Sequence, residues 1–580
     1  MSEPPLYIPS LLLEIDGRRE TDEQIRRLME DILQVSVEES LHLPGMFTLV
    51  IKNDYFPGAA EQESPWRYQS MLQIGKIVKV GFRSSTTAAQ EFDDEEKGYV
   101  IQGEITAIET HFTQESQAPI VVRGYDVSHR LHRGRYNRSF QNMTDTDIIN
   151  KIAKEVGISV GQAEASGEPH DYVFQENQTN MEFMRDRAIR LGFELFVRDG
   201  KLYFRKPKHE EMLALKWLQE IHSFRVRTSS AEQVKSVEVR GWNYGEKQPI
   251  VSVANATKTV HTETENGKGA DSSTKFSSMP TPKLVVVDKP SFKPKEVDRL
   301  AQALFDELGG EYVCADAIAE GNPKIRPGCR IKLEKMGNYS GKYYVTETRH
   351  LFQKRVYTTE ISVRGLRSGD LLEVLTPKTA LKPGQTCLVG IVTDIKDPQG
   401  WGRVKVKFPT LTEEHSSNWA RVVTLGAGKD RGFDCLPEVN DEVLVAFEHG
   451  DIHRPYIIGN VWNGKDKPPE SVNDSVQGGK VRLRTFRTRV GHKLQFVDED
   501  KGTSKKGVYV ETSNGHKLRL NDSDRKIEVV SNLGHKVTLD DSSSSISIES
   551  KGNITIKAVG NMDLNANGVI TVKGQLIRLN

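Results

Sequence analysis

The sequence predicts a mainly β protein: an N-terminal α+β region, a small closed β-barrel and a C-terminal β-structure shared between chains. Three observations lead to this prediction. Only three stretches carry apolar residues at helical spacing over a useful length. Five short β-rich segments, separated by turn residues, lie within residues 386–462. The last hundred residues repeat one short motif and then alternate apolar with polar residues.

The three predicted helices have recognisable starts or stops. Glycine follows each pattern, and a Thr-x-x-Asp or Thr-x-x-Glu capping box opens the first two. Proline precedes the third helix, where a missing amide hydrogen costs nothing. The predicted helices span residues 145–156, 181–191 and 295–308. In residues 1–250 we expect two helices among short strands.

Turn and linker composition divides the chain. At roughly 100–200 residues per domain, 580 residues correspond to about three to five domains. The turn sequences DPQGWG, GAGKDRG and EHGDIHRP separate five strands, a spacing typical of a small barrel. The predicted parts are residues 1–375 with a long polar loop excursion at 252–282, a barrel at 380–465, a linker at 466–480 and a C-terminal domain at 481–580.

The C-terminal domain begins with a repeat. The tripeptide Gly-His-Lys starts at residues 491, 515 and 534, and each copy is followed by an alternating strand and an acidic turn. Such repetition predicts a solenoid or fibrous β-structure. We expect His492, His516 and His535 in turns or at the surface, with metal binding by stacked histidines as the open alternative.

The residues after the repeat alternate with a period of two. From Ile546 to Leu576, every even-numbered residue except Ser550 is apolar or small, so one side of the ribbon belongs in a core. Glycines eight residues apart predict bends that keep this parity. The predicted core residues are Ile546, Ile548, Ile554, Ile556, Met562, Leu564, Ile570 and Val572, and the predicted bends are Gly552, Gly560 and Gly568.

One such ribbon cannot cover its own apolar side or protect its two edges. Identical chains wound around one axis solve both problems, because each chain covers the edges of its neighbours. Three chains make the smallest closed β-prism. We therefore predict an obligate homotrimer.

Composition and charge restrict the partners. The chain holds 80 Lys and Arg against 80 Asp and Glu, so there is no chain-wide basic field and we expect no nucleic acid partner. The balance is uneven, however. Residues 477–580 carry 18 basic and 11 acidic residues, or +7, and the rest carries 62 and 69, or −7. An anionic envelope is therefore a candidate contact of the C-terminal domain.

The N-terminal sequence and the cysteines indicate the compartment. The first residues lack a basic n-region and a long apolar run, so we expect synthesis in the cytoplasm without a signal peptide. The four cysteines are far apart and form no CxxC pair, so we expect buried free thiols. They are Cys314, Cys329, Cys387 and Cys435.

Motifs of known chemistry are missing. Residues 426–432, GAGKDRG, lack the GxxxxGK[ST] spacing of a phosphate loop, and the adjacent acids at 93–96 read as a solvated loop. The sequence contains neither HExxH nor GxSxG. We therefore predict no catalytic residue, no cofactor and no resident metal.

Two segments resemble a known family. Residues 418–469 hold Trp419-Ala-Arg421, Leu436-Pro-Glu-Val, an alternating run from Asp441 to Asp451 and Arg454-Pro, in the order found in the OB-type barrel of VgrG spike proteins and phage baseplate spikes. Residues 125–157 and 174–204 resemble the hub region of the same proteins. The resemblance covers nearly the whole chain.

The resemblance implies a complete architecture and a function. It implies β-barrel-like hub domains with a few helices, an OB-type barrel and a C-terminal, intertwined triple-stranded β-helix needle. A homotrimer of this kind would be the spike at the tip of a contractile injection system, joining the inner tube and puncturing the target envelope when the sheath contracts. Implied partners are the tube protein, baseplate proteins, effector cargo and a PAAR-type tip protein. The predicted contacts of that tip protein are Ile577, Arg578, Leu579 and Asn580.

Two departures favour a minimal, non-enzymatic form. The gap at residues 463–490 is too short for the lysozyme domain of some phage spikes, and the sequence stops at Asn580, close to the last alternating strand. Contractile particles that are released outside the cell use compact spikes of this kind. The resemblance therefore favours such a particle over a type VI secretion system. Two alternatives remain: a spike with cell-wall hydrolase activity from dispersed carboxylates, and a trimeric adhesin or tail fibre.

Overall fold

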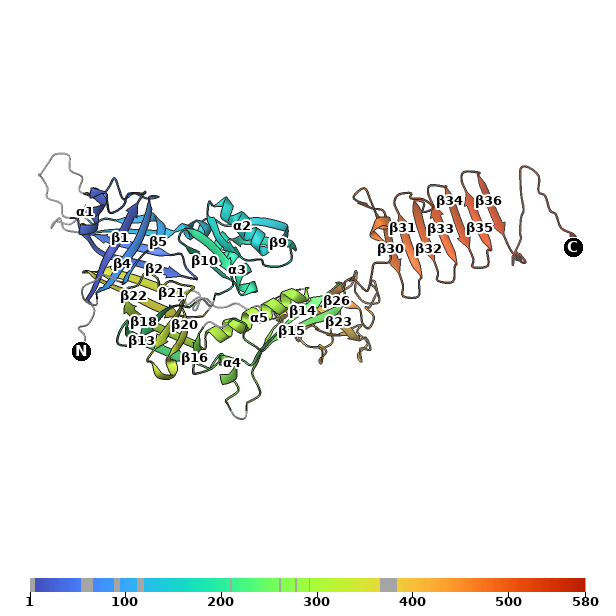
Figure 1. The fold of residues 1–580 in the computed structure, drawn as a ribbon. Coiled ribbons are helices and arrows are strands. Elements are labelled where there is room, and N and C mark those ends of the chain that lie inside the picture. The colour runs from blue at the N-terminus through green and yellow to red at the C-terminus, as the bar shows by residue number, and fades with distance from the viewer. Residues whose placement is uncertain are drawn as a thin grey trace. The chain divides into compact units, whose positions relative to one another are not determined.

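The computed structural model describes residues 6–53, 66–87, 94–111, 119–208, 211–259, 262–276, 279–289, 291, 293–365 and 383–578. The chain forms two compact units, residues 1–461 and 462–580, and each is described by itself (Figure 1). Within the described residues, no helix is long and apolar enough to cross a membrane.

The first unit is organised around a ten-stranded antiparallel sheet. Its two halves come from segments far apart in the sequence, and the pairing of β2 with β21, from Gln34↔Gln353 to Ser40↔Glu347, joins them. In spatial order the strands are β1 (Leu6–Ile15), β4 (Ile77–Thr87), β5 (Asp94–Glu109), β6 (Ile120–Asp126), β3 (Met46–Ile51), β2 (Ile32–Ser40), β21 (Glu347–Gln353), β22 (Val356–Val363), β18 (Val313–Glu320) and β13 (Ile221–Thr228).

A short helix on this sheet was not predicted. Helix α1 (Glu23–Asp31) begins after Asp22, whose side chain accepts a hydrogen bond from the Gln24 amide. Ile25 and Leu28 are buried in the core of the sheet. The sequence does not indicate this helix, because nine residues with two buried positions are too short for a visible periodic pattern.

An α+β segment of about 80 residues follows β6. Helices α2 (Asp145–Glu155) and α3 (Asn180–Leu191) lie where they were predicted, and both capping boxes, Thr144 with Asp147 and Thr179 with Glu182, are confirmed. The strands of this segment are β7 (Tyr136–Met143) paired with β9 (His170–Gln178), and β8 (Ser159–Ala163), β10 (Glu194–Arg198) and β11 (Lys201–Arg205) in a second small sheet.

The third predicted helix is also confirmed. Helix α5 (Pro294–Gly310) buries Val297, Leu300, Ala301 and Phe305 against a small sheet. That sheet contains β14 (Ser236–Asn243), β15 (Gln248–Ala254) and β17 (Lys283–Val286).

The excursion predicted at 252–282 is only partly a loop. It contains β16 (Glu263–Thr264) and a one-turn helix, α4 (Gly269–Ser272). The expectation failed because β16 pairs with β20, some 75 residues downstream, and local composition carries no signal of such a partner. The sheet concerned contains β12 (Glu211–Lys216), β19 (Arg330–Glu334), β20 (Gly341–Tyr344) and β16.

All five strands predicted for the barrel are present. Backbone hydrogen bonds between Val404 and Ala420 join the strand at one end of the sheet to the segment at the other end, which closes it. Valines and Ile457 fill the interior. The strands, in spatial order, are β24 (Lys405–Lys407), β23 (Leu388–Asp394), β26 (Glu442–Phe447), β27 (Pro455–Asn460) and β25 (Arg421–Val422).

The cysteine expectation is correct only in part. All four thiols are free, and Cys329 is buried. Cys387 and Cys435 are exposed, so the expectation of burial is wrong for these two. Cys387 directly precedes β23, and Cys435 lies in the connection between β25 and β26, so neither points into the barrel from a strand.

The second unit contains a seven-stranded antiparallel sheet in which every strand pairs with its sequence neighbour. The predicted linker, 466–480, holds a one-turn helix, α7 (Val472–Ser475), and a hairpin of β28 (Val476–Gln477) and β29 (Lys480–Val481). The strands of the sheet are β30 (Leu483–Arg487), β31 (Lys493–Val497), β32 (Gly507–Glu511), β33 (Lys517–Asn521), β34 (Lys526–Val530), β35 (Lys536–Asp540) and β36 (Ser545–Glu549). Turns of 3₁₀ helix lie elsewhere, at Val127–His132, Gly337–Tyr339, Pro383–Gln385 and Glu448–Gly450.

A buried ion pair ties β2 to the segment between β18 and β19. The Arg326 guanidinium donates to both carboxylate oxygens of Glu39, at 2.5 and 2.6 Å, and both residues are buried. We expect Arg326→Met to lower the free energy of unfolding of the first unit by about 3–5 kcal/mol, because it leaves a buried carboxylate without its partner. Denaturant titration followed by tryptophan fluorescence measures this change.

The matched control is Lys324→Met. Lys324 pairs with Glu96 at 2.7 Å in an exposed position, so its removal should cost at most about 1 kcal/mol. Equal losses in the two variants would contradict the assignment.

Candidate functional site: the apolar face of the C-terminal sheet

The seven strands β30–β36 are each five residues long and lie side by side in one layer (Figure 1). Side chains on a strand alternate between the two faces, so the second and fourth residues of every strand share one face. The antiparallel register keeps these residues opposite one another from strand to strand, as in Leu518↔Val529 and Leu520↔Ile527. Two columns of side chains therefore run along the whole sheet.

These two columns form what we term the apolar face. Every member except Arg484 is aliphatic or aromatic. One column contains Phe486, Leu494, Val510, Leu518, Val529, Val537 and Ile548, and the other contains Arg484, Phe496, Val508, Leu520, Ile527, Leu539 and Ile546.

No layer of the described second unit covers this face. Eleven of its thirteen apolar side chains are exposed, from 36 % for Leu494 to 72 % for Ile546, and Val508 and Val537 are half-buried. Burial of one such side chain stabilises a structure by about 1.5–3 kcal/mol. Thirteen of them in two unbroken columns make the face far larger than the scattered apolar residues of an ordinary surface. The face is therefore a surface for association.

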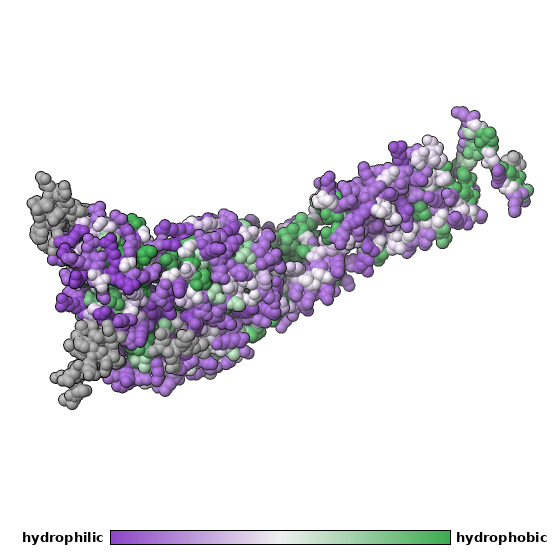
Figure 2. All heavy atoms as spheres, turned by 45° about the horizontal axis from the view of Figure 1, so that its top comes forward, coloured by the Kyte–Doolittle hydropathy of each residue, from purple (hydrophilic) through white to green (hydrophobic). Residues whose placement is uncertain are grey.

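The opposite face is polar and carries cross-strand ion pairs. Arg519 lies between Glu511 and Glu528, at 3.8 and 3.7 Å, and Glu528 also pairs with Lys536 at 2.5 Å. Figure 2 shows hydrophilic residues over much of this unit and hydrophobic ones gathered on the segment after β36. The ion pairs on the polar face indicate that this face meets water when the apolar face is covered.

The structure places the predicted core residues in two groups. Ile546 and Ile548 lie on β36 and extend the two apolar columns. Residues 550–578 contain no helix or strand and are exposed except for Ser550, so the remaining residues are not gathered into a core of this chain. They are Ile554, Ile556, Met562, Leu564, Ile570 and Val572. Their role as a needle core stays a prediction.

The backbone of this last segment bends at residues 551–552, 559–560 and 567–568, positions that include Gly552, Gly560 and Gly568. Among the predicted tip residues, Ile577 and Arg578 are exposed, whereas Leu579 and Asn580 lie outside the described residues.

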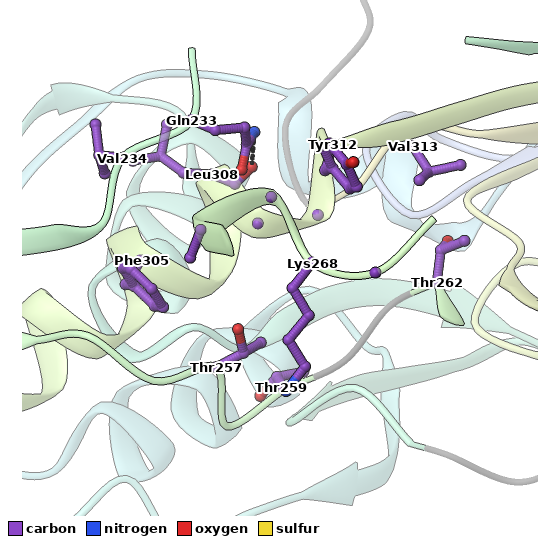
Figure 3. Close-up of a pocket in the computed structure, with 15 residues that line it drawn as sticks. Gln233, Val234, Thr257, Thr259, Thr262, Lys268, Phe305, Leu308, Tyr312 and Val313 are labelled. Atoms are coloured by element: carbon purple, nitrogen blue, oxygen red, sulfur yellow. Dashed lines mark hydrogen bonds between the residues drawn. The ribbon is translucent and has the colours of Figure 1, made fainter. Parts of the chain in front are cut away.

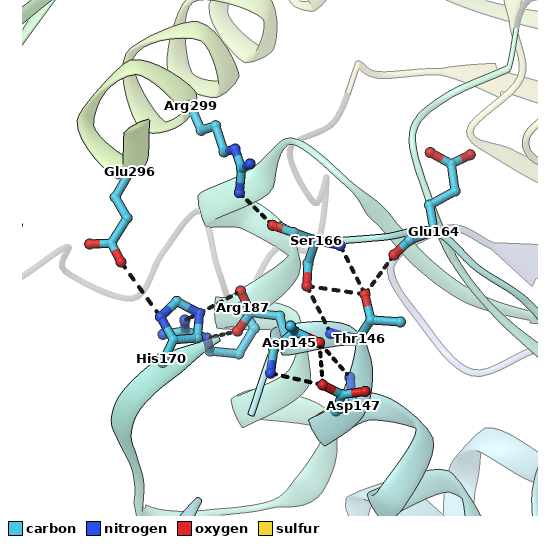
Figure 4. Close-up of polar contacts among 10 residues, drawn as sticks. Asp145, Thr146, Asp147, Glu164, Ser166, His170, Arg187, Glu296 and Arg299 are labelled. Atoms are coloured by element: carbon cyan, nitrogen blue, oxygen red, sulfur yellow. Dashed lines mark hydrogen bonds and ion pairs between the residues drawn. The ribbon is translucent and has the colours of Figure 1, made fainter. Parts of the chain in front are cut away.

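The first unit contains one buried polar cluster that could suggest catalysis (Figure 4). His170 Nε2 lies 3.0 Å from Asp145 Oδ2, and Arg187 Nε donates to Asp145 Oδ1 at 2.5 Å. His170 Nδ1 lies 3.5 Å from Glu296 on α5. Sequence analysis missed this cluster, because its members are dispersed over 150 residues.

Carboxylates on both sides of the His170 imidazole determine its charge. Hydrogen bonds to Asp145 and then to Glu296 raise the pKa of His170 to about 9, although burial and the charge of Arg187 oppose the shift. Burial raises the pKa of Asp145, but the bond to His170 and the Arg187 charge outweigh it and leave the pKa below its ordinary value. The imidazolium thus links β9 to α5. The nearby Ser166 hydroxyl accepts hydrogen bonds from the amide and the hydroxyl of Thr146, at 2.9 and 3.0 Å.

A recess beside α4 and α5 is too small for a substrate. Figure 3 shows Thr257, Thr259, Lys268 and Tyr312 around it, and its volume is about 40 Å³, room for little more than one water molecule. Among the described residues, no group of three or more His, Cys, Asp or Glu side chains is placed to hold a metal ion.

Comparisons with known proteins address the barrel directly. Residues 388–462 match the model of the type VI secretion system/phage-baseplate injector OB domain. The barrel is similar to the injector OB domain. The matched residues contain the whole five-stranded sheet, and the resemblance to VgrG spike proteins is confirmed. A second model, the Alg8 N-terminal domain, matches residues 88–354, under half of the chain.

Curated relatives share short regions with this protein. The spike protein VgrG2a of Pseudomonas aeruginosa is 30 % identical over 102 residues, which cover 17 % of this chain and 12 % of that protein. VgrG3 of Vibrio cholerae is 31 % identical over 120 residues, covering 19 % and 12 %. The matched region thus spans about an eighth of these relatives.

Among solved structures, the 43 kDa tail protein of prophage MuSo2 from Shewanella oneidensis is similar with a TM-score of 0.44 and 15 % identity. The alignment covers 61 % of this chain and 98 % of that one.

The charged cluster predicts a pH effect on stability. Because the pKa of His170 is raised in the folded state to about 9, its stabilisation is fully present below its unfolded pKa near 6.5 and is lost as the pH rises through 9. We expect His170→Gln to remove this dependence and to cost about 1–2 kcal/mol at pH 6, after allowance for solvent screening. Denaturation midpoints of the first unit from pH 6 to 10 measure it.

The exposed His222, changed to Gln, serves as the control and should leave the pH dependence intact. The raised pKa of His170 would be contradicted if, between pH 6 and pH 10, the denaturation midpoint of the wild type fell no more steeply than that of His170→Gln.

Proposed function

We propose that this protein is a structural spike at the tip of a contractile injection system. In this proposal three identical chains form the spike, which joins the inner tube and punctures a target envelope when the sheath contracts. The single observation that carries the proposal is the uncovered apolar face of β30–β36 in a chain whose preceding barrel is similar to the injector OB domain.

The apolar face explains why the chain associates. Antiparallel hairpins leave only β30 and β36 as hydrogen-bonding edges, so the sheet is complete in its own plane. It lacks only a partner above the apolar columns. Copies of the same sheet supply a partner of matching length, spacing and chemistry, with the polar, ion-paired face turned to water.

The segment after β36 explains the number of chains. Its period-two pattern suits extended ribbons, but no strand of the described chain pairs with residues 550–578 on either edge. Two ribbons could satisfy only one edge each, whereas three are the smallest number that gives every ribbon two neighbours. The homotrimer follows from this count.

The mechanism in this proposal is mechanical. A prism of short strands with a continuous apolar interior resists bending, so it would concentrate the force of sheath contraction on a small tip. A PAAR-type tip protein is the proposed partner of the exposed Ile577 and Arg578. Tube protein, baseplate proteins and effector cargo are the other proposed partners.

The proposal includes no enzymatic step. The named relatives are type VI secretion spike proteins, and the histidine cluster of the first unit is an ion-paired link between β9 and α5. Synthesis in the cytoplasm, followed by assembly into a contractile particle that is released outside the cell, remains part of the proposal.

Two neighbouring residues on β36 test the assembly. We expect Ile548→Asp to abolish the trimer at micromolar concentration, because it would place three carboxylates inside the apolar interior at a cost of several kcal/mol each. Ser547→Asp adds the same charge on the opposite face and should leave the trimer intact. Analytical ultracentrifugation of the full chain gives the oligomeric state.

The same pair tests the spike role in contractile particles isolated from the producing cell. Incorporation of Ser547→Asp but not of Ile548→Asp is the expected outcome. Trimers that survive Ile548→Asp, or particles that assemble and deliver normally with it, would contradict the proposal.

A further inference from the structure

Three hairpin turns along one side of the C-terminal sheet share one geometry. Each runs from a Thr or Ser to a His four residues later, with Gly before the His. The Gly amide donates to the carbonyl of the Thr or Ser, and the His amide donates to its hydroxyl, all at 2.9–3.1 Å. The glycines have φ between 87° and 100°, a region that disfavours side chains. The turns span residues 488–492, 512–516 and 531–535.

In every case the imidazole reaches across to the next turn. Its Nδ1 accepts a hydrogen bond from the amide of the residue that follows the next Thr or Ser, always at 3.2 Å. The pairs are His492 with Ser513, His516 with Asn532, and His535 with Lys551. We call each of these hydrogen bonds from a backbone amide to a histidine Nδ1 a hook. The hooks connect successive turns, and the last one reaches the start of the segment after β36.

The donor in each hook is a backbone amide, which fixes the protonation state of the ring. An amide N–H can only donate, so Nδ1 must offer a lone pair, and the neutral ring carries its hydrogen on Nε2. A proton added to Nδ1 would place two donors against each other. Each hook therefore exists only while its histidine is neutral.

We propose that His492, His516 and His535 form a proton-sensitive latch that holds successive turns of the C-terminal sheet together at neutral pH and releases them in acid. This proposal goes beyond the spike function, because the latch lies within one chain and does not depend on how many chains assemble. It assigns a role to the Gly-His-Lys repeat that neither a core nor a metal site supplies.

Among the described residues, no negative charge lies close enough to hold a charged ring in place. No carboxylate of the described residues lies within ion-pair distance of these three rings. Each histidine is followed by a lysine, and Lys551 lies in the turn that faces His535. Glu511 and Glu528 on the adjoining strands pair with Lys493 and Lys536 instead.

Two further neighbours complete the set. The Ser550 hydroxyl lies 3.0 Å from His535 Nδ1 and carries no charge, and Arg489 lies in the turn that precedes His492. Protonation therefore opens a hook and does not exchange it for an ion pair.

Hydrogen–deuterium exchange of the full chain at pH 8 and pH 5 tests the latch. After correction for intrinsic exchange rates, we expect the protection of the Ser513, Asn532 and Lys551 amides to fall about tenfold or more at pH 5. Amides within β33 serve as an internal reference and should keep their protection.

The control variant carries His492→Asn, His516→Asn and His535→Asn. The Asn side-chain oxygen can accept the same hydrogen bond without titrating, so we expect equal protection at both pH values. Wild-type protection that is equal at pH 8 and pH 5, or an Asn variant that loses as much as the wild type, would overturn the latch. The mass of the assembly, recorded on the same samples, reports on the trimer separately.

Discussion

The need to bury one apolar face governs the second unit of this molecule, residues 462–580. Two columns of aliphatic and aromatic side chains extend over seven strands, and no part of the described second unit lies over them. A sheet of this kind cannot remain dispersed in water as a single chain, because every strand adds exposed apolar area. Association is thus a property of the fold, and an interior that runs the length of the sheet provides stiffness along the same direction.

The first unit is stabilised in a different way. Its strands form cores within the chain, and buried or half-buried charges link its segments: Arg326 to Glu39 across the large sheet, and His170 between Asp145 and Glu296. Such groups stabilise little by themselves but cost much when one partner is lost, so they favour one fixed arrangement. A rigid platform of this kind suits the proposed contact of the spike with a tube.

The sequence reveals the features that repeat or that obey local rules. The capping boxes at Thr144 and Thr179 and the turn sequences of the barrel predict their elements closely. Elements stabilised by distant partners escape such reasoning: α1 needs the core of the large sheet, and β16 needs β20. The exposure of Cys387 and Cys435 likewise depends on the shape of the barrel.

The predicted site shows the same division. A period of two identifies the apolar side of residues 546–576 but not what covers it. Ile546 and Ile548 extend the apolar face, whereas the later residues pair with no strand of the described chain. The Gly-His-Lys repeat is plain in the sequence, yet its hooks depend on turns stacked 19 to 24 residues apart. No local pattern indicates which ring nitrogen accepts.

The central claim is that three chains share one interior. Native mass spectrometry of the full-length protein at micromolar concentration and neutral pH tests it most directly. The account predicts a single species of three times the 65.2 kDa of one chain. A stable monomer or dimer under these conditions would contradict it.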